Sequence, residues 1–197
     1  MQRARGKLIV LYGINNLGKS TQAKLLVEKL RTEGKTAEYI KYPTYQKDPS
    51  GVILNDYLRG GNPYGLSARE AQIFYAFNRA QTQTELLELL DKNDFVVAED
   101  YWGTGVAWGT GAGVDYEFLK RINAFCYRED LAFLFYGTRF AESIEQGHTH
   151  ESDTELVEKV REVHERLAEE YGWVKVNANE SIEQVGEVVW SSLKSIL

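Results

Sequence analysis

Sulfur-containing residues are scarce in this sequence of 197 residues, which has one cysteine and one methionine. The 23 lysine and arginine residues are fewer than the 29 acidic ones, so the formal net charge is -6 at pH 7. The single thiol, Cys126, excludes a disulfide within the chain, and its apolar neighbours predict a buried, unreactive side chain. A reducing, cytoplasmic setting fits this composition best. The acidic balance argues against a nucleic-acid partner, whose binding needs clustered lysine and arginine to displace counterions from phosphates.

Long apolar runs and low-complexity tracts are missing as well. No stretch approaches the length of about 18 apolar residues that a membrane-spanning helix requires, so no membrane partner is expected. Hydrophobic residues make up 43% and charged residues 26% of the chain, which is the balance of an ordinary globular protein. We therefore expect residues 1–197 to form one domain.

Short apolar runs without alternation have the composition of buried strands in a parallel sheet. Such strands are covered on both faces, so polar residues do not alternate with apolar ones. A more polar run at 36–42 is expected to form a flanking strand. The buried runs lie at 7–12, 94–99, 131–136 and 173–178.

Segments with helical periodicity separate these runs. They lie at 20–32, 67–91, 115–126, 139–146, 154–171 and 181–195. Three begin with capping-box spacing, in which a hydroxyl and a side chain three residues later satisfy free helix N–H groups. These pairs are Ser67 with Glu70, Ser152 with Glu155, and Ser181 with Gln184. Strands alternating with helices predict a three-layer α/β/α fold around a five-stranded parallel sheet.

The segment LYGINNLGKST, from Leu11 to Thr21, matches the phosphate-binding pattern G-x-x-x-x-G-K-[ST]. A predicted strand precedes it and a predicted helix follows it, so backbone N–H groups and the helix N-terminus can surround phosphates. Lys19 is then expected to reach the outer phosphates of ATP, and the Ser20 hydroxyl to ligate Mg²⁺. The alternative is a glycine-rich turn that resembles the motif by chance. The predicted ATP-binding residues here are Gly13, Asn15, Asn16, Leu17, Gly18, Lys19, Ser20 and Thr21.

Two carboxylates, Glu99 and Asp100, follow the third predicted strand. In parallel α/β sheets, ligands bind beyond the carboxyl ends of the strands, which is where these side chains lie. A carboxylate there can hold the water shell of Mg²⁺ or accept a proton from an attacking oxygen. The alternative is that each satisfies N–H groups of a turn. We predict Lys19, Glu99, Asp100 and Asn15 as catalytic residues, and Ser20 with Glu99 as the metal site.

These segments resemble the thymidylate kinase family of the P-loop nucleoside monophosphate kinase superfamily, over nearly the whole chain. GINNLGKSTQAKLLVEKL resembles the family's loop and first helix, KYP its Phe-Pro segment, and FYAFNRAQ its base-binding helix. EDYWGTGVAWGTGAG resembles its Asp-Arg-Tyr segment, and NANESIEQVGEVVW its last strand and helix. GHTHE lies where the family has its lid. The resemblance implies a P-loop NTPase fold with a short lid at about 145–154.

The resemblance also implies that Tyr75 stacks on a pyrimidine base, Arg79 hydrogen-bonds the base, and Tyr42 and Trp108 form the pocket walls. A spacing of four residues places Tyr75 and Arg79 on the same side of a helix, so one base can contact both. A core aromatic residue and a plain surface arginine are the alternatives. The other implied substrate-binding residues are Pro43, Tyr45 and Thr104, and His150 of the lid is implied for ATP.

The chain departs from the family at charged positions. The family usually has an acid at Asn15, an arginine at Asn16 or in the lid at His150, and arginines at Asp100 and Tyr45. A transition-state arginine contributes a factor of roughly 10³ to 10⁵ in rate, or about 4 to 7 kcal/mol. The lost charge therefore needs a replacement. The candidates are Lys41, Arg59, Arg69, Arg121 and Arg128.

We therefore predict a kinase that moves the γ-phosphoryl group of ATP onto dTMP with Mg²⁺, giving dTDP. Its partner is a small-molecule nucleotide, and the resemblance implies a homodimer. Two alternatives stay open: a kinase of unphosphorylated nucleosides or other small hydroxyl compounds, with Glu99 or Asp100 as base, and a nucleotide-binding protein without turnover. HTHESD, at 148–153, also admits a metal site, although neighbouring ligands on one loop rarely complete one alone.

Overall fold

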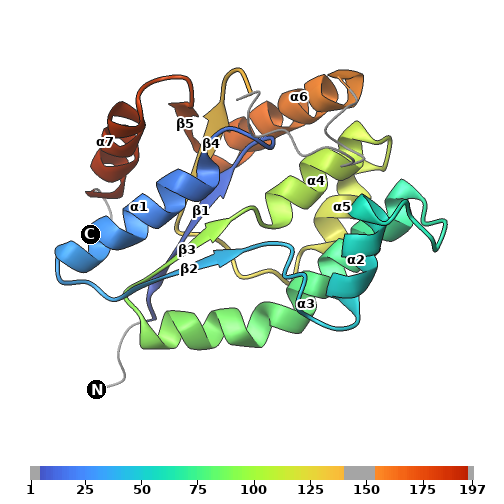
Figure 1. Cartoon of the computed structure of the whole chain (residues 1–197), viewed down its shortest axis with the longest axis horizontal. Coiled ribbons are helices and arrows are strands. Elements are labelled where there is room, and N and C mark those ends of the chain that lie inside the picture. The colour runs from blue at the N-terminus through green and yellow to red at the C-terminus, as the bar shows by residue number, and fades with distance from the viewer. Residues whose placement is uncertain (1–4, 140–153, 195–197) are drawn as a thin grey trace.

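The core of the fold is a five-stranded parallel sheet in the order β2-β3-β1-β4-β5. A computed structural model describes residues 5–139 and 154–194 of the chain (Figure 1). Inner strand β1 pairs with β3 from Lys7 opposite Phe95 and with β4 from Ile9 opposite Leu131. The strands are β1 (Lys7–Tyr12), β2 (Ala37–Lys41), β3 (Phe95–Glu99), β4 (Leu131–Tyr136) and β5 (Val174–Asn177).

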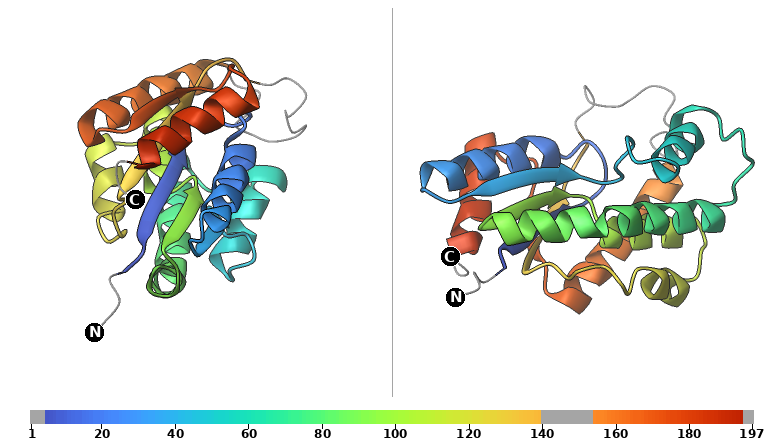
Figure 2. Two further views of the ribbon diagram at one scale, coloured as in Figure 1. Left: turned by 90° about the vertical axis from the view of Figure 1, so that its left-hand side faces the viewer. Right: turned by 90° about the horizontal axis from the view of Figure 1, so that it is seen from below.

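Helices cover both faces of the sheet, as the apolar strands require. Helix α1 packs with α7 on one face, whereas α4 packs with α3, α5 and α6 on the other. Figure 2 shows α1 separated from α3 and α5 by the strands. Among the described residues, no helix is both long and apolar enough to cross a bilayer. The helices are α1 (Lys19–Thr32), α2 (Ser50–Arg59), α3 (Ala68–Lys92), α4 (Trp102–Gly111), α5 (Tyr116–Ile122), α6 (Thr154–Tyr171) and α7 (Ile182–Leu193).

The predicted three-layer fold, with its five parallel strands, is confirmed. The capping boxes at Ser67 and Ser181 are both present, with each hydroxyl accepting a hydrogen bond from the backbone N–H three residues later. The helix predicted at 115–126 is shorter and ends at Ile122. Residues 140–153 lie outside the described part of the chain. They include the helix predicted at 139–146 except its first residue, the predicted capping residue Ser152, and the predicted lid at about 145–154 except its last residue.

The sequence analysis predicted no helix at 102–111, where the structure has α4. Each glycine in a helix interior costs about 1 kcal/mol relative to alanine, so WGTGVAWGTG has little intrinsic helix preference. Packing overrides this preference, because the neighbours approach too closely for side chains. A Cβ at Gly103 would lie 2.6 Å from the Trp173 ring, and one at Gly109 would lie 2.7 Å from Leu119.

Helix α2 was not predicted either, because its glycine and β-branched residues do not favour a helix. It is fixed against α3 through the fully buried Asn78, whose amide nitrogen donates to Ser50 Oγ at 2.8 Å. The same side chain accepts from the Thr44 N–H at 2.8 Å and donates to the Thr44 carbonyl at 2.9 Å. Asn78 therefore holds the segment between β2 and α2 beside the carboxyl ends of the strands.

Candidate active site

A cavity of about 380 Å³ opens at the carboxyl ends of the strands. This volume lies in the range of roughly 300 to 1,000 Å³ that is typical of small-molecule sites. Predicted site residues that line it are Asn15, Asn16, Leu17, Gly18, Lys19, Ser20, Thr21, Tyr42, Pro43, Tyr45, Tyr75, Arg79, Glu99, Asp100, Thr104 and Trp108. His150 lies outside the described residues.

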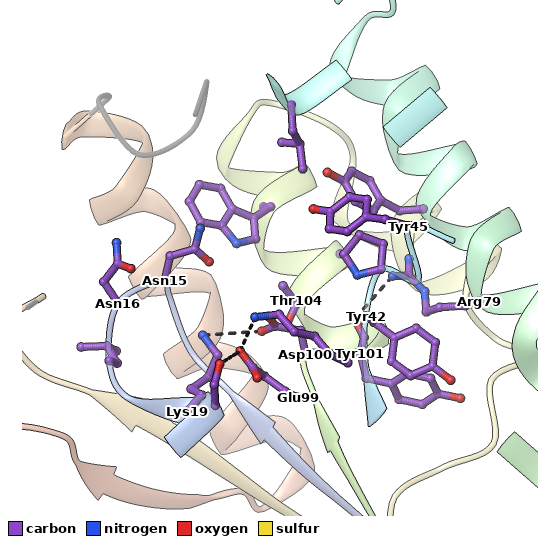
Figure 3. A pocket seen from close by; sticks show the side chains of 18 of the residues that line it. Asn15, Asn16, Lys19, Tyr42, Tyr45, Arg79, Glu99, Asp100, Tyr101 and Thr104 are labelled. Atoms are coloured by element: carbon purple, nitrogen blue, oxygen red, sulfur yellow. Dashed lines mark hydrogen bonds and ion pairs between the residues drawn. The ribbon is translucent and has the colours of Figure 1, made fainter. Parts of the chain in front are cut away.

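The cavity has two chemically different ends (Figure 3). The P-loop is residues 13–20, and the loop end comprises its residues 15–20 with Lys41, Glu99 and Asp100. Gly13, also predicted as an ATP-binding residue, shapes the loop but is not among the lining residues. The helix end comprises Gln72, Tyr75 and Arg79 of α3 with Gly105 of α4. In Figure 3, Lys19, Glu99 and Asp100 lie together, and Arg79 lies apart from them beside Tyr42 and Tyr101.

The P-loop backbone curves around the Lys19 ammonium. Gly13 and Gly18 have φ angles of 135° and 73°, in the region that favours glycine. A Cβ at Gly13 would also lie 2.5 Å from the Phe135 carbonyl oxygen, so no side chain fits there. Lys19 Nζ donates to the carbonyl oxygens of Gly13 at 2.9 Å and Ile14 at 2.7 Å. The loop therefore holds this buried ammonium with its own carbonyl oxygens.

Glu99 is buried at the end of β3 and accepts hydrogen bonds from three side chains. Its Oε1 accepts from Ser20 Oγ and from Lys41 Nζ, both at 2.8 Å, and its Oε2 accepts from the Tyr39 hydroxyl at 2.5 Å. Burial raises the pKa of Glu99, but the charges of Lys19 and Lys41 and the hydrogen bonds outweigh it, so the pKa lies below the ordinary value. Glu99 is therefore a carboxylate at neutral pH.

Ser20 and Glu99 present neighbouring oxygen atoms, which are the donors that Mg²⁺ prefers. The residues fit the predicted cation, because Oγ and Oε1 already lie 2.8 Å apart at the start of α1. Within residues 5–139 and 154–194, no cluster of three or more histidine, cysteine, aspartate or glutamate side chains forms a metal site. The HTHESD segment proposed as an alternative site lies outside these residues.

Asp100 has a φ of 57°, which is unusual for a residue other than glycine. Backbone conformations of this kind cost about 1 to 3 kcal/mol and cluster at functional sites. Asp100 Oδ1 accepts from Thr104 Oγ1 at 3.1 Å and lies 3.6 Å from Lys19 Nζ. Burial raises the pKa of Asp100, and the Glu99 charge adds to this rise while Lys19 opposes it. The turn thus directs a carboxylate at the lysine of the P-loop.

Arg79 is a buried residue, only 3% exposed, which excludes the plain surface arginine considered above. Its Nε donates to Asn123 Oδ1 at 2.9 Å, and its Nη1 donates to the Tyr101 carbonyl at 3.5 Å. Tyr75, one helical turn earlier, lines the cavity and also packs against the small cluster around Tyr57. Helix α3 therefore presents both predicted base-binding side chains to the cavity.

Two of the candidate replacement cations line the cavity, Lys41 and Arg59. The Arg59 guanidinium carbon lies 4.9 Å from the ring centroid of Tyr45, which stands where the resemblance implies an arginine. Arg59 therefore lies next to the position where the expected arginine is missing. The other candidates contact side chains away from the cavity: Arg69 lies over Phe118, Arg121 pairs with Asp115, and Arg128 lies over Trp102.

Four residues that line the cavity were not among the predicted site residues: Gln72, Gly105, Tyr101 and Leu58. Gln72 had a signal, because it precedes Tyr75 by three positions and Arg79 by seven on the same helix. These spacings place all three side chains on one face. Gly105 had no signal in the sequence, because its role depends on the Gln72 and Arg79 side chains that pack against it in the fold.

Comparisons with known proteins agree on one family. The model of the family described as thymidylate kinase matches residues 11–189. A probable thymidylate kinase of Pyrococcus abyssi is 32% identical over 200 residues, which cover 96% of this chain and 97% of that protein. A thymidylate kinase of Schizosaccharomyces pombe is 30% identical over 188 residues, covering 92% and 88%. The structure of a thymidylate kinase from Candida albicans superposes with a TM-score of 0.78 at 23% identity, covering 98% and 93%.

Proposed function

The chain belongs to the thymidylate kinase family, and we propose that it phosphorylates dTMP inside the cavity between the P-loop and α3. As a member of this family it is an ATP-dependent phosphotransferase that converts dTMP to dTDP. One observation carries the assignment of the site. Lys19, Ser20 and Glu99 face one end of the cavity, and Tyr75 with Arg79 faces the other. A nucleotide acceptor bound between them has its phosphate near the loop end, where phosphoryl transfer takes place, and its base against α3.

At the loop end, the P-loop binds the ATP phosphates. Gly13 and Gly18 shape the backbone, and Lys19 exchanges the loop carbonyls for phosphate oxygens. The amides of Asn15 and Asn16 donate hydrogen bonds to phosphate at the mouth of the cavity. Neutral donors are about half as strong as charged ones, so Lys19 carries most of the stabilisation of developing negative charge.

Ser20 and Glu99 would hold Mg²⁺ at the same end. When bound, Mg²⁺ neutralises charge on the transferring phosphoryl group. Asp100 positions Lys19 through the 3.6 Å ion pair, while Thr104 donates to the Asp100 carboxylate and fixes it. In phosphoryl transfer the protein mainly positions groups and supplies electrostatic stabilisation, which is what these contacts provide.

The acceptor phosphate lies between the two ends. Lys41 and Arg59 supply positive charge there, in place of the arginines that the family has at Asp100 and Tyr45. Lys41 is half-exposed and already bonded to Glu99, so its ammonium can shift between the carboxylate and an incoming phosphate. The base stacks on Tyr75, hydrogen-bonds Arg79, and is walled by Tyr42, Pro43 and Trp108.

We further propose that residues 1–197 act as one kinase domain in the cytoplasm, and as a homodimer. Ile73 and Phe77, four residues apart on α3, are 46% and 42% exposed, which supports an interface on that helix. Sedimentation of the wild type and of Phe77→Glu tests this. A dimer that the charged variant dissociates is expected, and a wild type that sediments as a monomer would contradict it.

A coupled ADP-release assay with ATP and Mg²⁺ tests the proposed function. The acceptor panel comprises dTMP, thymidine, dCMP, dGMP and dAMP. We expect preferential turnover of dTMP. Preferential turnover of thymidine would favour the nucleoside kinase alternative, and ATP binding without turnover would favour the binding-protein alternative. Lys19→Ala serves as the inactive control.

A further inference from the structure

Two buried polar atoms at the helix end of the cavity have no hydrogen-bond partner within residues 5–139 and 154–194: Gln72 Oε1 and Arg79 Nη2. Gln72 is 6% and Arg79 3% exposed. Leaving such a group unpaired costs about 1 to 3 kcal/mol, and few native groups are left so. One is an acceptor and the other a donor, and both side chains line the cavity.

The two atoms pack against the same side of Gly105. An ideal Cβ at Gly105 would lie 3.2 Å from Gln72 Oε1 and 2.7 Å from Arg79 Nη2. This close approach is possible because residue 105 has no side chain. Any larger residue at this position of α4 would contact both polar atoms. Gly105 therefore lets a buried, unpaired acceptor and a buried, unpaired donor lie side by side against α4.

Arg79 is held in a fixed orientation. Its Nε donates to the fully buried Asn123, whose own amide nitrogen donates to the Leu119 carbonyl at 2.8 Å. Nη1 is directed toward the Tyr101 carbonyl. Two of the three guanidinium nitrogens are thus bound to the protein, and Nη2 remains for a ligand. A guanidinium has only donors, so this position cannot adapt to a ligand that donates.

We propose that Gln72 is the residue that accepts the N3–H of thymine, while Arg79 Nη2 donates to the adjacent O4. This inference rests on the proposed function and deepens it, because it assigns the choice of base to a residue pair. Thymine presents a donor next to an acceptor, which complements Oε1 beside Nη2. Cytosine presents an unprotonated N3 next to an amino group, so its amino group faces the donor Nη2 and stays unpaired.

Rotation of the Gln72 carboxamide does not rescue cytosine. The turned amide would donate to the cytosine N3, but Arg79 Nη2 still meets a second donor. Sites that hydrogen-bond a substrate group reject analogues that lack it far more strongly than apolar pockets do. Uracil keeps both N3–H and O4, so the pair does not distinguish dUMP from dTMP.

Gln72→Met tests the assignment, because it keeps the side chain's length and removes its acceptor. We expect kcat/KM for dTMP and dUMP to fall by about 10- to 100-fold, mainly through KM, with little change for dCMP and for ATP. The dTMP preference over dCMP shrinks accordingly. The melting temperature stays level or rises, because a buried unpaired oxygen is removed.

Gln81→Met is the matched control, since Gln81 also lies on α3 and also has a buried side-chain oxygen without a partner among the described residues, but does not line the cavity. It is expected to leave the base preference unchanged. Equal losses for dTMP and dCMP in Gln72→Met, an unchanged dTMP affinity, or a lower melting temperature with unchanged preference would overturn the assignment.

Calorimetric titration of dTMP and dCMP without ATP separates this inference from the proposed function. If the wild type binds dTMP in preference to dCMP and Gln72→Met loses that preference, Gln72 selects the base even if turnover fails. If the wild type turns over dTMP and the variant binds both nucleotides as the wild type does, the function stands and the assignment of Gln72 is wrong.

Discussion

The two ends of the cavity satisfy their polar groups in opposite ways. At the loop end, Lys19 binds two carbonyls and faces Asp100, and Glu99 accepts from three side chains. At the helix end, Gln72 and Arg79 each keep one buried atom without a partner among the described residues. The loop end must exchange internal partners for a ligand, whereas the helix end already presents unpaired groups.

The magnitude of charge explains this difference. A buried carboxylate or ammonium without a counter-charge costs several kcal/mol, so Lys19, Glu99 and Asp100 pair with one another before a ligand binds. A single neutral amide oxygen costs only about 1 to 3 kcal/mol when unpaired, which a stable domain tolerates. A site can therefore leave a neutral oxygen such as Gln72 Oε1 unpaired for a base. The buried charge of Arg79 is held by two neutral acceptors, Asn123 and the Tyr101 carbonyl, and leaves only Nη2 unpaired.

The largest effect is expected from Lys19→Ala, which removes the central charge of the loop end. Phosphoryl transfer depends on neutralising developing negative charge, so we expect kcat to fall by at least about 10³-fold, or roughly 4 kcal/mol. MgATP affinity should fall as well, which calorimetry measures. Lys24→Ala, on the exposed side of α1, is the control. Unchanged ATP affinity in Lys19→Ala would show that the P-loop does not bind ATP as proposed.

Gly105→Ala alters the helix end alone. The new Cβ would lie 2.7 Å from Arg79 Nη2, which is too close, so the guanidinium that binds the base must shift. Alanine also favours the helix by about 1 kcal/mol, so the fold should persist. We expect KM for dTMP to rise by about 10- to 100-fold, or roughly 1.4 to 2.7 kcal/mol, while ATP affinity stays unchanged. A loss of ATP affinity would mean that the two ends are not independent.

The sequence predicts the loop end better than the helix end, and the reason is physical. The P-loop is local in sequence, since Gly13, Gly18, Lys19 and Ser20 act within one turn between a strand and a helix. The capping boxes and apolar strands are equally local. Their prediction needs no knowledge of what packs nearby.

The helix end depends on packing between elements that are distant in the sequence. Gln72 and Arg79 reach Gly105 only because α4 approaches α3 closely, and α4 itself has weak helix preference. Asn78 and Asn123 are ordinary amides in the sequence and become fixed supports in the fold. The replacement cations depend on the fold in the same way. The sequence offers five candidates, and only the structure shows that Lys41 and Arg59 line the cavity.

Arg59→Met tests whether charge between the two ends has replaced the missing arginines. We expect dTMP affinity to fall by about tenfold, or roughly 1.4 kcal/mol, because a charged hydrogen bond to phosphate contributes about that much. Thymidine affinity should not change, since thymidine has no phosphate. Arg69→Met is the control, because Arg69 lies over Phe118 away from the cavity. Equal losses of affinity for dTMP and thymidine would show that Arg59 supports the pocket by packing and does not bind the phosphate.

The smallest effect concerns His164, which tests whether an unpaired buried atom always marks a ligand. Its Nε2 also has no partner in the described part of the chain, and it lines a separate cavity of about 240 Å³ behind Ile14 and Leu17 of the P-loop. Nδ1 lies 3.0 Å from the Val160 carbonyl, so the neutral ring donates there and leaves Nε2 as an acceptor. Burial, reinforced by the Lys19 charge, lowers the pKa of His164 to about 3.

Because the folded state lowers this pKa from 6.5, the unfolded state binds the proton more readily. His164 therefore favours folding fully above pH 6.5, and this contribution is lost as the pH falls toward 3. Between pH 7.5 and 6.0 the wild type should lose about 0.8 kcal/mol more unfolding free energy than His164→Gln. Denaturant titrations at both pH values measure this difference. Parallel losses would show that the fold does not lower the pKa of His164, whereas an effect of dTMP on the difference would give His164 a ligand-linked role like that of Gln72.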